Sequence, residues 1–301
     1  APSEPNFRSL AHDMTCGDQF YGLDAPKISI RSAFVPPAAK VFVRADYSQL
    51  ELRIMAHFSG DRTLIHMLQN PEPNNLKDDP FTMLASKWYR KAPDTVLAEE
   101  RTNCKNLVYG LLYGSGAKKL ASDLRMCEEA AKSEVARFKS MLPRLMEWLD
   151  GIVIRAREEK PIARVTTISA RHRYFPDLHS KNNDDRAAAE RQAVNTVCQG
   201  SAADIFKTAV VRVIDTLRTK YLIERCQLVL TVHDECVFEC DARSAKAIAQ
   251  IVRHAMESVA NEFNLAVPLP VKVQIGSSLG DDAFAVVPRP SSRLPSAANT
   301  P

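Results

Sequence analysis

The sequence predicts an α+β fold, in which helices back an antiparallel sheet and a helical region is inserted between its strands. A β-branched and aromatic run at residues 41–45 indicates an early strand. Two further apolar runs, 228–232 and 236–239, are separated by three polar residues, which is typical of two strands joined by a tight turn. Most residues between these strands have helical periodicity. This order favours an antiparallel sheet with a helical insertion.

The first half of the chain begins with residues 1–40, which contain Gly and Pro residues and show no regular period. After the first strand, the spacing of apolar residues becomes helical. The expected elements are helices at 49–58 and 61–69, a proline-rich loop at 70–80, and a helical region over 81–150 with a break at Gly114-Ser115-Gly116.

The second half contains one long helical stretch and the remaining strands. The expected elements are a small hairpin from 165–168 and 173–175, a helix over 187–217, the two strands named above, a helix over 242–263 and a last strand over 271–275. In the long helix, one apolar face is expected to hold Ala193, Val194, Val197, Ala202, Ile205 and Ala209. Residues 287–301 are rich in Pro, Ser and Ala, which predicts a disordered tail.

Composition excludes several classes of protein. The chain has 301 residues and a formal charge of +4, which is only a weak indication of a polyanionic partner. No apolar run is long enough to span a membrane, and the first residues do not resemble a signal or transit peptide. Because the chain begins without Met, we expect a fragment. Its seven cysteines, an odd number without CxxC spacing, indicate small buried residues in a reduced compartment.

Asp46 follows directly after the strand at 41–45 and precedes a helix. A carboxylate at the end of a buried strand is costly unless a cation holds it, so a metal ion is one interpretation. The other is an N-cap for the following helix, which is a common use of Asp. On this segment alone the two interpretations are evenly balanced.

A second strand-end acid is present in His233-Asp234-Glu235, between the paired strands. Acids in such a turn are often only solvated, but with Asp46 they give two strand ends that one sheet can bring together. Carboxylates of this kind can hold two Mg²⁺ ions about 3.5–4 Å apart, an arrangement used for in-line displacement at phosphorus. Since Mg²⁺ prefers few carboxylates plus substrate phosphates, two aspartates are sufficient.

Two helical stripes carry ligand-binding side chains. Arg101, Lys105, Tyr109 and Tyr113 recur every four residues, as do Arg191, Asn195 and Gln199. The first stripe suits a nucleoside triphosphate, with cations on phosphates and rings stacking on base and sugar. The second suits hydrogen bonds to phosphates, sugars and base edges. A solvated polar helix edge is the alternative for the first stripe. The basic and aromatic run Arg171-His172-Arg173-Tyr174, upstream of the second stripe, is either a ligand-facing cluster or a solvated loop.

Together these segments resemble the family A DNA polymerases, with matching order from about residue 3 to residue 285. Residues 46–53 are similar to the first catalytic motif of the family, 101–114 to its nucleotide-binding helix, and 233–235 to its second catalytic motif. Ser3-Glu4-Pro5-Asn6 resembles the start of an upstream palm segment. Within the family, the run 189–195 and Tyr109 are most similar to polymerases of the theta type.

The resemblance implies roles for individual residues. Asp46 and Asp234, with the carbonyl of Tyr47, would ligate two Mg²⁺ ions, and Glu235 would lie near the metals. Gln49, within the first motif, would lie at the substrate, and Glu51 would exclude a ribose 2′-OH. Arg101 and Lys105 would bind triphosphate oxygens, and Lys105 would also act as general acid. Tyr109 would stack near the incoming sugar and base, and Tyr113 would pack at the insertion site. Contacts to the primer-template would come from Arg191, Asn195, Gln199 and His233, and we expect Arg171 of the upstream basic run to join them.

The resemblance also implies an organisation and a function. It divides the chain into a first palm part (1–60), helical fingers (61–185), a second palm part (186–286) and the tail, with the thumb absent or truncated. The expected function is template-directed addition of deoxynucleotides, from deoxynucleoside triphosphates, to a primer-template DNA, with a role in DNA repair. The chain is expected to be a monomer or part of a longer polypeptide. The expected location is the nucleus, with the mitochondrion as the alternative. A non-catalytic nucleic-acid-binding fragment or a single-subunit RNA polymerase are the alternative functions.

Overall fold

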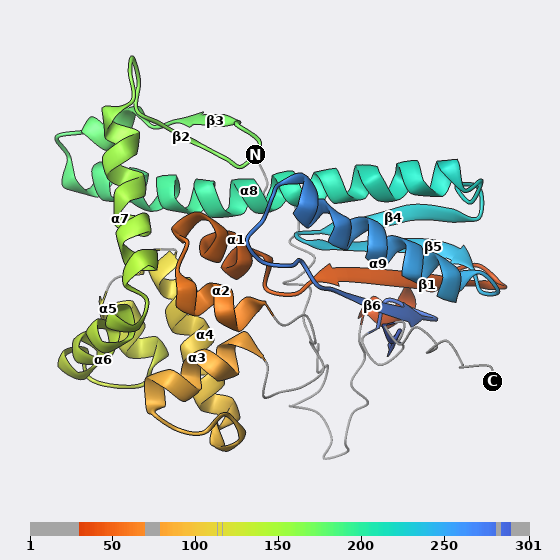
Figure 1. The fold of residues 1–301 in the computed structure, drawn as a ribbon, viewed down its shortest axis with the longest axis horizontal. Coiled ribbons are helices and arrows are strands. Elements are labelled where there is room, and N and C mark those ends of the chain that lie inside the picture. Colours follow the sequence, from red (N-terminus) through yellow and green to blue (C-terminus); the bar gives the residue numbers. More distant parts are fainter. Residues whose placement is uncertain (1–29, 70–78, 113, 116, 281–283, 290–301) are drawn as a thin grey trace, which may run out of the picture. The chain divides into compact units, whose positions relative to one another are not determined.

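The computed structural model describes residues 30–69, 79–112, 114–115, 117–280 and 284–289 (Figure 1). These residues divide into two compact units. The sheet unit takes its described residues from 1–46, 213–255 and 272–301, and the helical unit takes them from 47–212 and 256–271. The division into palm, fingers and tail stays a prediction.

The sheet has five strands in the order β4-β5-β1-β6-β7. In Figure 1, β4, β5, β1 and β6 lie side by side. Their bounds are β1 Lys40–Tyr47, β4 Cys226–Val232, β5 Glu235–Asp241, β6 Val271–Gly276 and β7 Phe284–Val286. β5 pairs antiparallel with both β1 and β4, and β6 pairs antiparallel with β7. The antiparallel sheet predicted from the sequence is therefore confirmed, whereas the sequence pattern does not predict β7.

The strands follow from their residue types. β-branched and aromatic side chains favour a pleated, half-buried surface. In β1, Val43 and Ala45 are fully buried, and in β5 Phe238 is fully buried. β4 lies at the sheet edge, where Val229 remains 47% exposed. The helix α9 (Ala245–Glu262) begins in this unit, with the side chains of Ile248, Ala249 and Val252 fully buried.

The helical unit contains the helical insertion expected from the sequence. Its elements are α1 Leu50–Ser59, α2 Arg62–Leu68, α3 Pro80–Tyr89, α4 Ala98–Leu112, α5 Ala117–Asp123, α6 Glu128–Met141, α7 Pro143–Glu158, the hairpin β2 Arg164–Thr166 and β3 His172–Tyr174, and most of α8 Asn183–Thr219. Short 3-10 helices lie at Pro93–Thr95 and Pro176–His179 here, and at Ile30–Ala33 in the sheet unit. α3 packs against α4, and the buried ring of Trp88 meets Phe138 edge-on at 5.5 Å between ring centroids.

Local signals fix the ends of these helices. Asp61 and Asp79 are the N-caps of α2 and α3, and each accepts hydrogen bonds from backbone N–H groups of the first turn. Pro80, which the sequence pattern places in a loop, is instead the first residue of α3, where its missing N–H costs nothing. The rest of that predicted loop, residues 70–78, lies outside the described residues. α4 ends before Gly114, whose φ of +63° is left-handed.

α8 is the longest described helix, with 37 residues. Its predicted apolar face is confirmed, because Ala193, Ile205 and Ala209 are fully buried and Val197 is 7% exposed. Val194 and Ala202 are half-buried. The opposite edge of the same helix is therefore available for the polar side chains that recur every four residues.

One expectation from the sequence is wrong. Cys127 is exposed rather than buried, because it is the N-cap residue of α6 and precedes the apolar face of that helix. At the start of the predicted tail, the N–H of Val287 donates to the carbonyl of Val273, and Arg253 donates to the carbonyls of Val287 and Pro288. Residues 290–301 lie outside the described part of the chain. Among the described helices, none has the length and apolarity to cross a membrane.

Candidate functional site

Three acids lie near one another along the backbone at one end of the β4–β5 hairpin in the sheet unit. Asp46 of β1 lies directly opposite Glu235, the first residue of β5, in the antiparallel ladder. Side chains directly opposite each other lie on the same face, about 4.5–5.5 Å apart at Cβ. Asp234 immediately precedes Glu235 in a two-residue turn, in which the exposed His233 has a φ of +56°. The register thus brings together two strand-end acids that are far apart in sequence.

The alternative role of Asp46 as a helix cap is excluded by the local backbone. α1 begins at Leu50, and its N-cap residue is Gln49, with a left-handed φ of 51° and no side-chain cap bond. Asp46 lies within β1, before this turn. Its half-buried carboxylate is therefore positioned by the sheet and not by the helix.

Arg44 supplies positive charge beside these acids. Its Nε lies 3.9 Å from Oε2 of Glu235, and its Nη2 donates to Oε1 of Gln274 at 2.9 Å. The guanidinium also lies over the ring of Phe284, 4.1 Å from the ring centroid. These contacts fix a cation two residues before Asp46, on the same side of the strand.

The acids suit a hard cation that is completed by substrate oxygens. Among the described residues, no cluster of three or more His, Cys, Asp or Glu side chains is arranged to hold a metal by itself. Mg²⁺ is usually held by one or two carboxylates together with phosphates and water, so the donor set at Asp46 and Asp234 fits it. The hydroxyl of Tyr47 donates to the carbonyl of Met256 at 2.8 Å, and the metal role predicted for its backbone oxygen stays a prediction.

Gln49 and Glu51 are half-buried at the start of α1, in the helical unit. Burial, and to a smaller extent the carboxylate of Glu51, raises the pKa of the Cys198 thiol. Glu51 therefore lies close to α8, where Cys198 is fully buried. The predicted roles of Gln49 and Glu51 at a substrate stay predictions.

The stripe on α4 has a different environment at each position. Arg101 forms a bidentate ion pair with Asp79, whereas Lys105, one turn further on, is exposed. Tyr109 is half-buried, and its ring meets Phe81 at 5.9 Å between centroids. Tyr113 lies outside the described residues. Arg101, Lys105 and Tyr109 follow one face of a described helix, as their spacing predicts.

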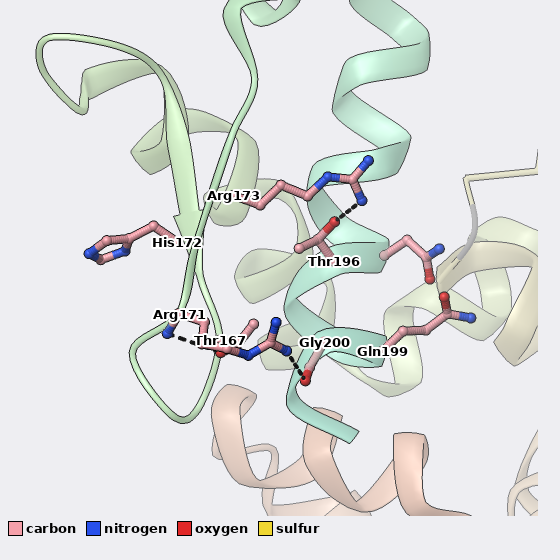
Figure 2. A pocket seen from close by; sticks show the side chains of 8 residues that line it. Thr167, Arg171, His172, Arg173, Thr196, Gln199 and Gly200 are labelled. Atoms are coloured by element: carbon pink, nitrogen blue, oxygen red, sulfur yellow. Dashed lines mark hydrogen bonds between the residues drawn. The ribbon is translucent and has the colours of Figure 1, made fainter. Parts of the chain in front are cut away.

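A cavity of about 280 Å³ lies between the β2–β3 hairpin and α8 (Figure 2). Its lining combines residues of both predicted nucleic-acid-binding segments: Thr167, Arg171, His172, Arg173, Asn195, Thr196, Gln199 and Gly200. Within the described residues, Oδ1 of Asn195 is buried and has no hydrogen-bond partner. The predicted residues Arg171, Asn195 and Gln199 thus line one cavity.

The two arginines of this cavity are held in different ways. Nε of Arg171 donates to Oδ1 of Asp204 at 2.5 Å, and its Nη2 donates to the carbonyl of Gly200. Arg173 donates instead to neutral groups, Oγ1 of Thr196 at 2.9 Å and Oε1 of Gln192 at 3.0 Å. The charge of Arg171 is therefore compensated by a carboxylate, whereas the contacts of Arg173 fix its direction without neutralising it.

Arg191 lies apart from this cavity, against the end of α4. A Cβ on Gly114 would lie 2.6 Å from Cγ of Arg191, so only glycine fits at that position. Both residues line a second cavity, of about 540 Å³, beside α7. The α8 stripe therefore does not act as one surface in the structure, because Asn195 and Gln199 line one cavity and Arg191 another.

The family is decided by comparison with known proteins. The model of "DNA polymerase family A" matches residues 3–281. The chain belongs to DNA polymerase family A. The family resemblance inferred from the four sequence segments is thereby confirmed.

Relatives within family A come from animals and bacteria. The chain is 33% identical over 285 residues to DNA polymerase theta of Drosophila melanogaster, covering 93% of the chain and 13% of that protein. It is 35% identical over 274 residues to the thermostable DNA polymerase I of Thermus aquaticus, covering 91% of the chain and 30% of that protein. The chain thus spans less than a third of either relative.

A solved family A structure agrees with the fold. The POL domain of Pol1 from M. smegmatis, in complex with DNA primer-template and dNTP, matches with a TM-score of 0.76 and 36% identity. The match covers 84% of this chain and 42% of that chain. The α+β architecture with an antiparallel sheet is therefore that of a family A polymerase domain.

Several residues around the family A motifs were missed by sequence reasoning. Asp79 and Phe81 support the α4 stripe, and Thr167 and Asp204 anchor Arg171. Asp79 precedes Pro80 at a helix start, which is a recognisable cap signal, but its partner is 22 residues away. Asp204 lies on the buried side of a long helix, where an acid indicates a paired cation, although the pattern does not reveal which one.

Proposed function

We propose that this chain is the core of a template-directed DNA polymerase, which adds deoxynucleotides to the 3′ end of a primer. The observation that carries the proposal is the register between β1 and β5, which sets Asp46 opposite Glu235 and next to the turn with Asp234. Membership of family A supports the same function.

In this proposal, Asp46 and Asp234 hold two Mg²⁺ ions through their carboxylates, with the Tyr47 carbonyl as a further oxygen ligand. When bound, the ions supply activation of the attacking 3′-hydroxyl and stabilisation of the leaving pyrophosphate oxygen. Glu235 lies beside them and keeps Arg44 close through its ion pair. The protein contributes positioning and electrostatic stabilisation, as is usual in phosphoryl transfer.

The helical unit would bind both nucleic acid and nucleotide. Arg101 and Lys105 of α4 bind triphosphate oxygens, and Lys105 donates a proton to the leaving group. Tyr109 stacks near the incoming sugar and base, and its ring packs against Phe81. The cavity of Figure 2 holds the primer-template backbone and base edges through Arg171, Asn195 and Gln199. The Pol1 POL domain from M. smegmatis is in complex with these same two ligands, DNA primer-template and dNTP.

A role in DNA repair, which the resemblance noted in the sequence implies, is also part of the proposal. Repair synthesis requires extension of a primer over a short template gap. The chemistry proposed above supplies that step without further residues.

The decisive experiment is primer extension on a defined template with Mg²⁺, using this chain and an N-terminally longer form. Extension with deoxynucleotides is expected, and Asp234→Asn is expected to abolish it. If Asp234→Asn extends primers as the unmodified chain does, the proposal is wrong. Equal use of ribonucleotides would identify an RNA polymerase instead. Binding of DNA without extension by either form would identify a non-catalytic binding module.

A further inference from the structure

Asp79 and Arg101 are joined by a bidentate ion pair. Nε of Arg101 donates to Oδ2 of Asp79 at 2.8 Å, and Nη2 donates to Oδ1 at 2.9 Å. Two parallel bonds between a planar guanidinium and a carboxylate fix direction as well as distance. Nη1 takes no part in this pair, and the Arg101 side chain remains 33% exposed. The pair therefore holds one edge of the guanidinium and leaves the side chain partly accessible to solvent.

The carboxylate is itself fixed by the start of α3. Oδ2 of Asp79 accepts from the backbone N–H of Thr82 at 2.8 Å and from its hydroxyl at 3.0 Å. The Asp79 side chain is only 11% exposed. Burial raises the pKa of Asp79, but the hydrogen bonds from Arg101 and Thr82 outweigh it, so the net shift is downward. The carboxylate is thus ionised and immobile beside Arg101 at neutral pH.

Phe81 supports the stripe from the same turn of α3. The guanidinium of Arg101 lies 5.8 Å from the centroid of the Phe81 ring, and the ring of Tyr109 lies 5.9 Å from it. Phe81 is 1% exposed, so it forms a buried surface beneath both side chains. The first turn of α3 therefore contacts Arg101 and Tyr109, which lie two turns apart on α4.

Lys105 provides a contrast on the same face. It is exposed, and no ion pair joins it to an acid within the described residues. The ammonium of Lys105 ends a flexible side chain and attracts an anion as a mobile point charge. The guanidinium of Arg101 is held in place, so its N–H groups donate hydrogen bonds in a fixed direction. The two cations of the stripe therefore differ in how they can bind an anion.

We propose that Asp79 is a positioning residue for nucleotide binding, which holds the guanidinium of Arg101 with its free edge ready for a triphosphate oxygen. This inference rests on the proposed polymerase function, because that function assigns the triphosphate to Arg101. Without Asp79, the long Arg101 side chain regains rotamer freedom, which must be lost again when the nucleotide binds. Asp79 acts on nucleotide affinity and not on binding of the primer-template.

The test is single-turnover incorporation of one deoxynucleotide by Asp79→Asn, over a range of nucleotide concentrations. Asn is as good an N-cap as Asp, so α3 keeps its start. We expect the apparent nucleotide Kd to rise about tenfold, the size expected for losing one charge-assisted contact. The maximal incorporation rate and the primer-template Kd are expected to stay unchanged.

Two comparisons separate positioning from stability. Asp61→Asn changes the matching N-cap of α2, whose side-chain hydrogen bonds in the described structure go to Thr63, Leu64 and Leu145 and not to Arg101, and it should leave nucleotide affinity unchanged. In an Arg101→Ala background, Asp79→Asn should have no further effect, since the group that it positions is gone. Additive effects, or an unchanged nucleotide Kd in Asp79→Asn, would overturn this inference while leaving the polymerase proposal intact. Failure of the unmodified chain to extend primers would instead overturn the polymerase proposal.

Discussion

Asp46 lies directly opposite Glu235 in the antiparallel ladder between β1 and β5. Like charges in such a pair repel each other, so the arrangement is costly unless cations share the site. Arg44 contributes one cation, 3.9 Å from Glu235. The juxtaposition of Asp46 and Glu235 therefore favours cation binding and does not by itself stabilise the fold.

The first prediction concerns Asp46→Asn, which keeps the size of the side chain and removes the charge that we propose to bind a metal ion. We expect primer extension to fall about a thousandfold or more, because metal coordination supplies several kcal/mol of transition-state stabilisation. Extension should be measured beside Asp215→Asn, which changes an acid on α8 that is 62% exposed. Thermal unfolding should show that both variants fold. Extension by Asp46→Asn at the unmodified rate would exclude a metal role for this residue.

Much of the fold could be predicted because its signals are local. The alternation in β1, the spacing of apolar residues in α8 and the turn at His233-Asp234 all depend on neighbours in sequence. β7 could not be predicted in this way. Its three residues carry too little pattern, and it exists because it pairs with β6.

The site could be predicted only in part for the same reason. The residue types of Asp46 and Arg101 follow from short motifs, but their partners depend on tertiary packing. Arg101 meets Asp79 because α3 packs on α4, and Arg171 meets Asp204 because the hairpin packs on α8. Sequence spacing does not reveal that Arg171 is neutralised whereas Arg173 is not.

The second prediction uses that difference. Arg173→Ala should weaken DNA binding uniformly across sequences and reduce the salt dependence, log K against log salt, by about one unit. The reason is that its partners, Thr196 and Gln192, are neutral, so its charge is available to a phosphate. Fluorescence anisotropy with labelled primer-template at several salt concentrations measures both. Arg218→Ala is the control, since Arg218 is 66% exposed and pairs with Asp215 on the distal part of α8. An unchanged salt slope in Arg173→Ala would place DNA elsewhere.

The third prediction concerns sugar selection. Glu51→Ala should increase incorporation of ribonucleotides relative to deoxynucleotides, because Glu51, which is half-buried, is the side chain proposed to exclude a 2′-OH. The ratio of kcat/KM for the two nucleotides measures this selection. Glu129→Ala is a matched control, because Glu129 is also an acid in the first turn of a helix and is exposed on α6. Equal discrimination in Glu51→Ala and the unmodified chain would remove Glu51 from the sugar site.

The fourth prediction concerns stability. Arg53 is 2% exposed and donates to the carbonyls of Ser48, Leu68 and Pro268, at 2.8, 2.9 and 2.8 Å. Arg53→Met should lower the free energy of unfolding by about 3 kcal/mol, because buried carbonyls lose their donors. Arg53→Lys should cost less, since an ammonium can still reach some of them. Urea unfolding followed by circular dichroism measures the difference. If Arg53→Met lowered the free energy of unfolding by less than Arg53→Lys does, these hydrogen bonds would not stabilise the fold.

The fifth prediction concerns the reactivity of the thiols. Burial, with a smaller effect of Cys240, raises the pKa of Cys226 to about 12, and burial raises that of Cys240 to about 11. At pH 7.5 both thiols stay protonated and covered, whereas Cys127 is exposed. A maleimide should therefore label Cys127 far faster than Cys226 or Cys240, as measured by peptide mass spectrometry, and Cys127→Ser should remove the labelling of that peptide. Comparable labelling of Cys226 in the native chain would contradict its burial.

The same thiols give a direction for stability against pH. Their folded pKa lies above that of an unfolded thiol, near 9.0. Their contribution is therefore fully present below that value, and it declines as pH rises toward the folded pKa, because only the unfolded chain releases the protons. The free energy of unfolding should fall between pH 9 and 11, and Cys226→Ala should reduce this fall, although it also leaves a cavity. A pH dependence that is unchanged in Cys226→Ala would assign the loss of stability to other groups.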